Sequence, residues 1–210
     1  MSAETILLFA AASLILALTP GPNWVYLLSR TLCQGRRAGL VSWSGTTLGF
    51  TFHMFAAALG LSALLLAVPY AYDAVRLAGA AYLLWLAYST LRGAAGAPFA
   101  PLTLPAVPDG VLFRQGVMSS VLNPKVALFY LALFPQFIDP AHGSVFAQSL
   151  LLGAVQIAVT SGFDVLLVLA AAGIARRITA RPGWLRAQRV VLGSAFGALA
   201  AWLALDRRGG

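Results

Sequence analysis

The chain has 210 residues, of which 60% are hydrophobic and 10% are charged, with a formal net charge of +8. A soluble globular domain is about 45–50% apolar and about 25% charged, so this composition excludes a soluble enzyme and a disordered segment. The excess of Lys and Arg does not indicate nucleic-acid binding. In so apolar a chain, what matters is where these residues lie relative to the apolar runs. The single cysteine, Cys33, excludes an intrachain disulfide and a cysteine-based metal cluster. We predict neither a cofactor nor a resident metal.

Continuous apolar runs predict six membrane-crossing helices. A crossing helix needs about 20 mostly apolar residues. Runs of this length occupy roughly Thr5–Ser29, Leu40–Leu66, Asp73–Leu91, Val111–Ile138, Val145–Ile174 and Val190–Leu205. Their apolar residues are continuous and not alternating, which excludes the strands of a membrane barrel. The predicted fold class is therefore an all-α membrane protein, embedded in a lipid bilayer and without a soluble domain.

A Pro/Ala-rich stretch, residues 92–110, divides the six runs into two groups of three. It contains Pro98, Pro101, Pro105 and Pro108, a density typical of a linker. The predicted domains are a first three-helix repeat (1–91), this linker (92–110) and a second three-helix repeat (111–210). Because three is an odd number of crossings, two related halves would be inverted relative to each other, as in many transporters.

The arginines predict which side of the membrane each loop faces. Ten arginines flank the first, third and fifth loops: Arg30, Arg36, Arg37, Arg92, Arg114, Arg176, Arg177, Arg181, Arg186 and Arg189. Three lie on the other side: Arg76, Arg207 and Arg208. Cytoplasmic loops carry the excess of Lys and Arg. The linker is therefore predicted to be cytoplasmic, and both termini are predicted to lie outside.

The first predicted helix is interrupted near its middle. The segment Thr19 to Asn23 contains Pro20, Gly21 and Pro22. Proline lacks a backbone N–H and pushes the preceding residue out of the helical region. Two prolines around a glycine therefore predict a break and not a bend, and they leave carbonyls of the preceding turn without their helical donors. The alternative is a plain proline kink.

The fourth predicted helix, the first of the second half, has an interruption at the corresponding place. Asn123 followed by Pro124 and Lys125 is a good combination of N-cap and first helical residue. A new helix would then start inside the membrane in each half. Such a start exposes unpaired N–H groups and a partial positive charge, which suit a carboxylate. Broken backbone at this depth is tolerated only within protein or beside a wet cavity.

Asp164 is the strongest of three ionisable residues near the middle of predicted helices. A charge in the hydrocarbon costs roughly 2.5–3.5 kcal/mol on insertion scales and indicates function by default. At about 100° per residue, Gly153, Gln156, Thr160 and Asp164 form one narrow polar stripe, which should face protein or water. The alternative is a structural hydrogen-bonding or ion-pairing role.

Lys125 and His53 are the other two candidates. An ammonium beside a helix start is electrostatically disfavoured, so Lys125 makes sense if an anion completes the arrangement. The alternative is a lysine that pairs with Asp164 or extends toward a lipid headgroup. His53 shares a side of its helix with Gly45, Gly49 and Gly60, whose small size lets helices approach closely, so it should face the bundle. There it could titrate near neutral pH or serve as a hydrogen-bonded core histidine.

Two further patterns carry weaker information. The glycine pairs Gly45/Gly49 and Gly193/Gly197 favour packing within the bundle, and a homodimer is the alternative interpretation. The five tryptophans mostly suit anchoring at the membrane interface: Trp24, Trp43, Trp85, Trp184 and Trp202.

The segment Thr19 to Asn23 closely resembles the signature of the lysine exporter / homoserine–threonine efflux (LysE/RhtB) family. Other parts of the chain are similar to further features of that family: the ladder Gly35, Gly39, Gly45 and Gly49, then His53 with the segment 60–65, and Asn123–Lys125 with Phe129. The resemblance implies a bacterial inner-membrane exporter of amino acids or close derivatives, driven by the proton gradient. A related branch transfers electrons between thiols and disulfides, which needs paired cysteines, and Cys33 stands alone.

The predicted ligand is a zwitterionic amino acid. Its carboxylate would lie at the N–H groups just after Pro22 and Pro124, assisted by Lys125. Its ammonium would face Asp164 and the carbonyls of Leu16 and Leu18. The predicted substrate-binding residues are Pro20, Gly21, Pro22, Asn23, Asn123, Pro124, Lys125 and Asp164. The coupling proton would be carried by Asp164 or, second, by His53.

Three other functions compete with amino-acid export. A carrier of a metal cation or another small metabolite would prefer several mid-membrane carboxylates or thiolates, where this chain offers Asp164 and His53 with Lys125 opposing them. An intramembrane enzyme would need a paired nucleophile and base or a His/Glu cluster, and the chain has two histidines and no glutamate besides Glu4. A non-transporting membrane assembly subunit would not move solute when reconstituted alone.

Overall fold

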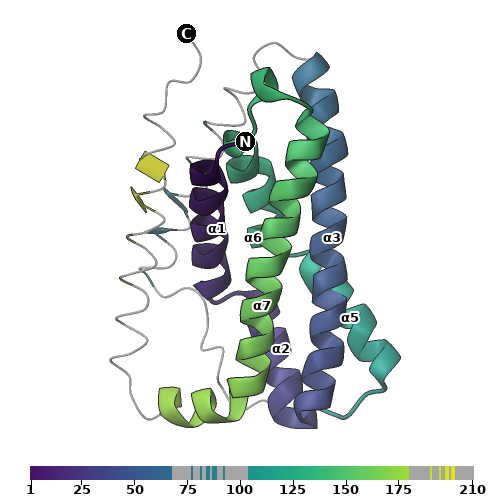
Figure 1. Ribbon diagram of the computed structural model, residues 1–210. Helices are drawn as coiled ribbons and strands as arrows, with labels where there is room; N and C mark the ends of the chain where they lie inside the picture. The colour runs from purple at the N-terminus through teal and green to yellow at the C-terminus, as the bar shows by residue number, and fades with distance from the viewer. Residues whose placement is uncertain are drawn as a thin grey trace.

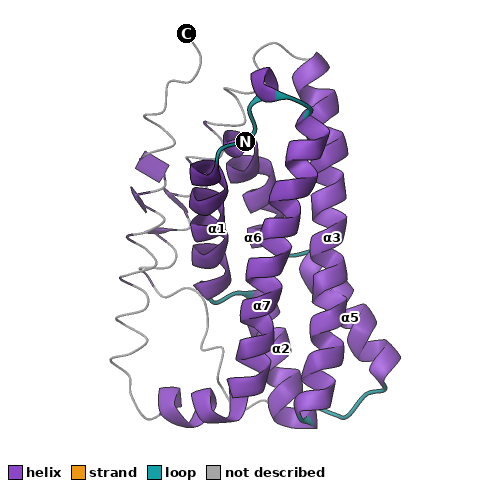
Figure 2. Ribbon diagram, viewed as in Figure 1, coloured by secondary structure: helices purple, strands orange, loops and turns teal. Residues whose placement is uncertain are grey.

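The computed structural model describes residues 1–67 and 104–179, together with single residues between positions 77 and 92 and between 190 and 201. Over the two continuous ranges every regular element is a helix, and the connections are short loops (Figure 2). The predicted all-α class is therefore confirmed for the described part of the chain. The predicted helices Asp73–Leu91 and Val190–Leu205, and most of the linker 92–110, lie outside the described residues.

The chain passes along the bundle several times. The described elements are α1 (Ala3–Leu18), α2 (Pro22–Gln34), α3 (Arg36–Ala67), α5 (Asp109–Val121), α6 (Pro124–Leu128), the π-helical turn η1 (Phe129–Leu133), the 3-10 turns η2 (Phe134–Phe137) and η3 (Pro140–His142), and α7 (Val145–Thr179). In Figure 1, α1 and α2 descend, α3 returns, α5 and α6 ascend, and α7 descends again. Helix α3 is central, because it packs extensively against both α5 and α7.

Three of the described segments have the length and composition of membrane crossings. Within α7, Val145–Ala171 meets this requirement as one continuous helix. The other two are bent pairs, each counted as one crossing: α1 with α2 bends by 56°, and α5 with Pro124–Phe137 bends by 42°. The predicted interruptions of the first and fourth helices are therefore present. The predicted helix Leu40–Leu66 coincides with α3, whose 32 residues span about 48 Å.

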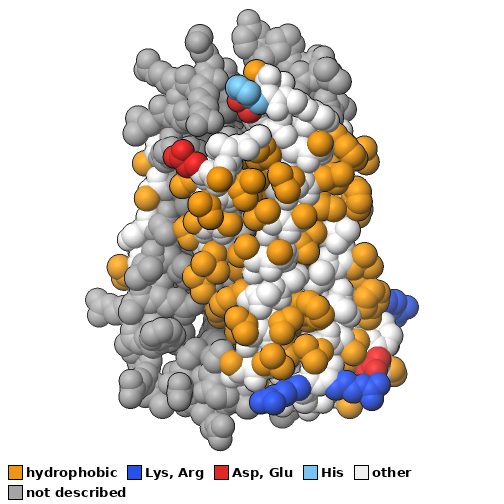
Figure 3. All heavy atoms as spheres, viewed as in Figure 1, with side chains coloured by type: hydrophobic (Ala, Val, Ile, Leu, Met, Phe, Trp, Pro, Cys, Tyr) orange, Lys and Arg blue, Asp and Glu red, His pale blue; other side chains and the backbone are white. Residues whose placement is uncertain are grey.

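Side chains on the outside of the bundle are distributed as a bilayer would require. Figure 3 shows a broad apolar band between one end where Lys and Arg gather and an opposite end that carries acidic side chains and a histidine. Large apolar side chains of the described helices are strongly exposed, such as Leu7 at 70%, Leu131 at 64% and Leu166 at 64%. Contiguous exposed apolar surface of this kind marks contact with lipid or with another protein.

Close packing between helices depends on the predicted small residues of α3. A Cβ atom added to Gly45 would collide with the backbone of Phe113, and one added to Gly49 would collide with the side chain of Ser120. Helix α5 can therefore lie directly against α3. His53 lies further along α3 and is 8% exposed. It therefore faces the interior of the bundle, as the sequence predicts.

Candidate functional site

The first interruption leaves a gap of three residues between two helices whose axes differ by 56°. Helix α1 ends at Leu18, and α2 begins at Pro22 with Gly21 as its N-cap. Gly21 has no side chain with which to cap the first turn of α2. The first backbone N–H of α2 that bonds within the helix is that of Val25, which donates to the Gly21 carbonyl at 3.1 Å. The N–H groups before it have no acceptor within α2.

The second interruption is capped by its own side chain. Asn123 Oδ1 accepts a hydrogen bond from the Lys125 backbone N–H at 3.0 Å, and Pro124 occupies the first helical position. The predicted combination of N-cap and proline is confirmed. Because the cap already uses the Lys125 N–H, this helix start is less open to a carboxylate than that of α2.

A buried amide pair joins the two interruptions. Asn23 Oδ1 accepts from Asn123 Nδ2 at 3.1 Å and from Ser119 Oγ at 3.1 Å. Asn23 is 6% exposed and Asn123 is 1% exposed. Residues about 100 positions apart in the chain are thereby held side by side at the two breaks, as the hypothesis of a shared site requires. Ser119 was not predicted to contribute, although it shares a helix face with Asn123.

The Lys125 ammonium crosses from the second interruption to the first. Its Nζ donates to the carbonyl oxygens of Leu16 at 3.1 Å and Thr19 at 2.5 Å. In an unbroken helix the Leu16 carbonyl would accept from residue 20, which is a proline and has no N–H. The Leu16 carbonyl is not wholly free, because it also accepts from the Thr19 N–H at 3.3 Å, and the lysine is its second donor.

A small cavity lies between the two interruptions and α7. Its volume is about 20 Å³, where one water molecule needs ~10–15 Å³ by this measure. It therefore has room for about one water molecule and not for an amino acid. Its lining consists of Leu16, Ala17, Asn23, Trp24, Phe50, Asn123, Lys125, Val126, Thr160 and Asp164. Four of the eight predicted substrate-binding residues belong to this lining: Asn23, Asn123, Lys125 and Asp164. The other four, Pro20, Gly21, Pro22 and Pro124, are not part of the lining and belong to the two interruptions beside it.

Asp164 is buried in this lining with an unsatisfied oxygen. The residue is 2% exposed, and its Oδ2 has no hydrogen-bond partner among the described residues. Its stripe on α7 is buried as predicted, with Gln156 at 0% and Thr160 at 5% exposure. A buried carboxyl without a full set of partners is costly, so its retention at a cavity indicates a ligand or proton-binding role.

His53 lies near the cavity but not in its lining. One ring nitrogen, Nε2, is 3.2 Å from the Ser120 carbonyl oxygen, and the ring stacks on Tyr130 with centroids 5.7 Å apart. Tyr130 Oη donates to Gln156 Oε1 at 2.8 Å, and Gln156 Nε2 donates to Thr160 Oγ1 at 3.0 Å. His53 therefore has the surroundings of a hydrogen-bonded core histidine, connected to the cavity through three further side chains.

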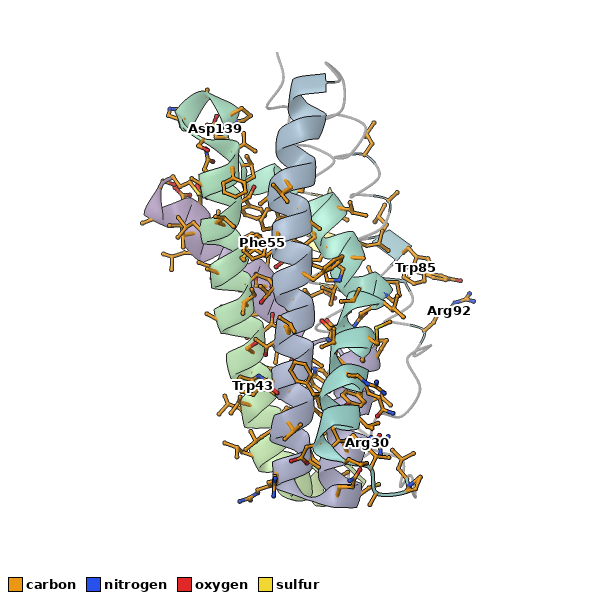
Figure 4. All side chains as sticks on the ribbon, turned by 90° about the vertical axis from the view of Figure 1, so that its right-hand side faces the viewer. Arg30, Trp43, Phe55, Trp85, Arg92 and Asp139 are labelled. Carbon is orange, nitrogen blue, oxygen red and sulfur yellow. The ribbon has the colours of Figure 1, made fainter. Side chains whose placement is uncertain are left out.

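Trp24 shows that the interfacial interpretation of the tryptophans was wrong for this residue. It is 6% exposed, its Nε1 donates to the Ala17 carbonyl at 2.8 Å, and its ring stacks on Phe163 at 5.4 Å. It satisfies a second carbonyl at the end of α1 and forms one wall of the cavity. Its position two residues after Pro22 was the available signal. Trp85 is 57% exposed but lies about midway along the bundle in Figure 4, and not at either end.

Within residues 1–67 and 104–179, no group of three or more His, Cys, Asp or Glu residues lies together in a way that could hold a metal ion. The charged groups at the cavity are instead one acid and one ammonium, Asp164 and Lys125. Such a pair, with amide and carbonyl groups beside it, matches the two opposite charges of a small zwitterion.

Comparisons with known proteins agree with this geometry. A model of the family described as LysE type translocator matches residues 14–207. The chain is 32% identical over 201 residues to a homoserine/homoserine lactone efflux protein of Salmonella typhimurium, covering 95% of this chain and 93% of the relative. It is 32% identical over 131 residues to a leucine efflux protein of Salmonella choleraesuis, covering 62% of each, and 26% identical over 196 residues to a leucine efflux protein of Enterobacter sp., covering 93% of each.

No solved structure matches the chain. The match of the family model covers nearly the whole sequence, and the family consists of translocators and not of enzymes, as the composition predicts. The chain belongs to the LysE type translocator family.

Proposed function

We propose that the protein exports an amino acid or a close derivative from the bacterial cytoplasm across the inner membrane, in exchange for protons. The observation that carries this proposal is that both helix interruptions and Asp164 meet at one cavity between the described helices. The names of the relatives, homoserine/homoserine lactone and leucine efflux proteins, support an amino-acid-like substrate.

The proposed architecture has six membrane helices in two inverted repeats, residues 1–91 and 111–210, joined by the cytoplasmic linker 92–110. It is supported by two bent helix pairs at the start of the two halves, which run in opposite directions in Figure 1. The gathering of Lys and Arg at one end supports a cytoplasmic placement of that end. Both termini would then lie outside, and export would proceed by rocking of one half against the other.

The proposed substrate is held by its two opposite charges. Its carboxylate binds at the open N–H groups in the first turn of α2, beside Asn23, where Gly21 leaves the helix uncapped. The Lys125 ammonium, which reaches the first interruption from the second, assists the carboxylate. The ammonium is received by Asp164 and by the Leu16 carbonyl, with charge-assisted hydrogen bonds. Because the cavity has room for about one water molecule, the elements around it must move apart when an amino acid binds.

Asp164 carries the coupling proton in this proposal, with His53 as the second candidate. Asp164 is in the cavity lining, whereas His53 is hydrogen-bonded outside it. The energy scale is sufficient: a thousandfold gradient of a neutral solute costs about 4.1 kcal/mol, and a proton moving down ~150 mV supplies roughly 3.5 kcal/mol. One or two protons for each exported molecule would suffice.

Counterflow from proteoliposomes tests this function. The purified protein is reconstituted alone and loaded with a panel of amino acids, including homoserine and leucine, with and without a pH gradient. We expect exchange of at least one amino acid, and accumulation that depends on the gradient. If no amino acid is transported, export is contradicted and the assembly-subunit alternative is favoured. If transport occurs but does not depend on the pH gradient, proton antiport is contradicted.

A further inference from the structure

The carbonyl oxygens of Leu16 and Thr19 form an acceptor pair that a primary ammonium fills. The Lys125 Nζ donates to both, at 3.1 and 2.5 Å. Pro20 cannot supply the N–H that would bond the Leu16 carbonyl in a continuous helix. That carbonyl accepts from the Thr19 N–H at 3.3 Å and has a second lone pair for the ammonium. The pair belongs to the end of α1, whereas the ammonium that fills it comes from α6 in the other half of the chain.

Gly21 leaves the space that the ammonium needs. A Cβ atom at this position would lie 3.1 Å from Lys125 Nζ and 3.2 Å from Lys125 Cε, which is tighter than an ordinary van der Waals contact. The backbone of Gly21 is extended, with φ of −165°, a conformation that any residue can adopt. The absence of a side chain at residue 21 therefore matters for the room it gives to Lys125 and not for backbone freedom.

Lys125 and a substrate ammonium compete for the same acceptors. Each presents N–H donors on a tetrahedral cation, and each needs oxygen acceptors in a site removed from water. The remaining cavity has room for about one water molecule, and Lys125 is part of its lining. A ligand ammonium can therefore reach the carbonyl pair only when Lys125 has moved away from it.

We propose that the Leu16 and Thr19 carbonyls are a binding site for primary ammonium groups, and that Lys125 occupies it as an internal substitute for the ligand until the ligand displaces it. The displaced Lys125 ammonium is then available to the carboxylate of the same ligand. The Lys125 side chain thus bonds the two carbonyls when no ligand is bound and the ligand carboxylate when one is. The displacement step rests on the proposed export of amino acids, whereas the ammonium site itself does not.

Removal of the lysine side chain beyond Cβ tests the site directly. Lys125→Ala deletes the atoms from Cγ to Nζ, which together correspond to n-propylammonium. We expect n-propylammonium to raise the thermal unfolding temperature of the purified variant with increasing concentration and to leave that of the wild-type protein unchanged, because binding to the folded state alone stabilises it. Tetramethylammonium, a cation without N–H donors, should have no effect on either protein.

A second variant keeps the test decisive if the alanine variant does not fold. Lys125→Met fills the side-chain positions up to Cε and lacks Nζ, so the ammonium ion takes the place of n-propylammonium as the probe. Stabilisation of neither variant by its matching cation, or equal stabilisation of variant and wild type, would overturn the proposal. So would stabilisation by tetramethylammonium as strong as that by the matching cation, because a carbonyl pair requires N–H donors.

Ligand binding separates this proposal from a simple carboxylate clamp. A site that is open only part of the time binds with an affinity reduced by the open fraction. The methyl ester of the transported amino acid, which has an ammonium and no carboxylate, should therefore bind Lys125→Ala about tenfold or more tightly than wild type. An unchanged or weaker affinity for the ester would contradict the displacement step. If the matching cation stabilises the variant but no amino acid shows counterflow, the ammonium site is supported and the proposed function is refuted. If an amino acid shows counterflow but the matching cation stabilises neither variant, the ammonium site is refuted and the proposed function is not.

Discussion

Individual residues at the cavity combine two buried charges with backbone groups that have lost their helical partners. Asp164 has an oxygen without a partner among the described residues, whereas the Lys125 ammonium donates to two carbonyls. Buried ionic groups are retained when they are paired or functional, since an uncompensated charge costs several kcal/mol. Each of these two side chains is therefore understandable as half of a site that a dipolar solute completes.

Gly21→Ala adds a single methyl group and tests whether the space beside Gly21 is needed for transport. The added Cβ would crowd the Lys125 ammonium and Cε, so we expect a clear loss of amino-acid exchange, of about tenfold if roughly 1.4 kcal/mol of binding is lost. Gly162→Ala on α7 is the matched control, because no atom lies within 4 Å of its added Cβ. The measurement is counterflow by equal amounts of each reconstituted variant. Equal exchange in both variants would show that the space at Gly21 is not needed.

The residue types at the site were predictable, and their partners were predictable only in part. Proline chemistry identified the Leu16 carbonyl as an acceptor, and helical spacing identified the buried face of Asp164. The bonds of Lys125 were not predicted, because a side chain with four rotatable bonds can reach many acceptors and backbone carbonyls leave no mark in a sequence. The position of Trp24 was mispredicted for a similar reason. Tryptophan is common at membrane interfaces, but here its Nε1 donates to the Ala17 carbonyl, an acceptor that the sequence does not reveal.

At the scale of elements, two interrupted helices are fastened to each other at their breaks. Asn123 caps α6 and also donates to Asn23 beside the start of α2. Sequence predicted both starts because Pro and Asn are strong local signals. It did not predict the π-helical turn η1, because the residues of Phe129–Leu133 read as ordinary helix and the local geometry follows from packing in the aromatic cluster around Phe9.

Asn123→Ala should destabilise the protein more than Ser119→Ala. The first change removes both the cap of α6 and the amide bond to Asn23 at a position 1% exposed, which we expect to cost about 1–3 kcal/mol. The second removes one hydroxyl bond to the same Asn23 oxygen from a half-buried position, and should cost about 1 kcal/mol or less. Thermal unfolding of both variants in the same detergent measures the difference. Equal losses would contradict the role of Asn123 as the joint between the two breaks.

At the scale of the whole molecule, the Arg-rich end is closed by contacts between α2 and the start of the second half. Arg30, which Figure 4 places at the end of the bundle opposite Asp139, donates to the Pro105 carbonyl at 3.2 Å and to Gln115 Oε1 at 3.0 Å. Gln34 Nε2 donates to the Val107 carbonyl at 3.1 Å. Burial of this arginine was not predictable, because its acceptors come from a segment about 75 residues later in the chain. These contacts must separate if this end opens during transport.

The single cysteine offers a direct test of orientation. Cys33 is exposed near the end of α2, at the Arg-rich end that we propose is cytoplasmic. A membrane-impermeant maleimide should therefore label it in inside-out vesicles and not in right-side-out vesicles. The control is the double variant Cys33→Ser with Ser144→Cys, which moves the thiol to an exposed position before α7 at the opposite end and should show the reverse pattern. Labelling of Cys33 from the outside would invert the proposed topology.

The most direct test of the shared binding and coupling site is Asp164→Asn, measured as pH-driven transport of the amino acid identified by counterflow. The change keeps the size of the side chain and removes its charge and its proton-carrying capacity. Asp109→Asn is the matched control, because Asp109 is a surface carboxylate paired with Arg37 at 2.8 Å, and such exposed pairs contribute little. We predict that Asp164→Asn inserts and folds normally but loses gradient-driven transport, while Asp109→Asn transports as wild type. Wild-type transport by Asp164→Asn would contradict the account.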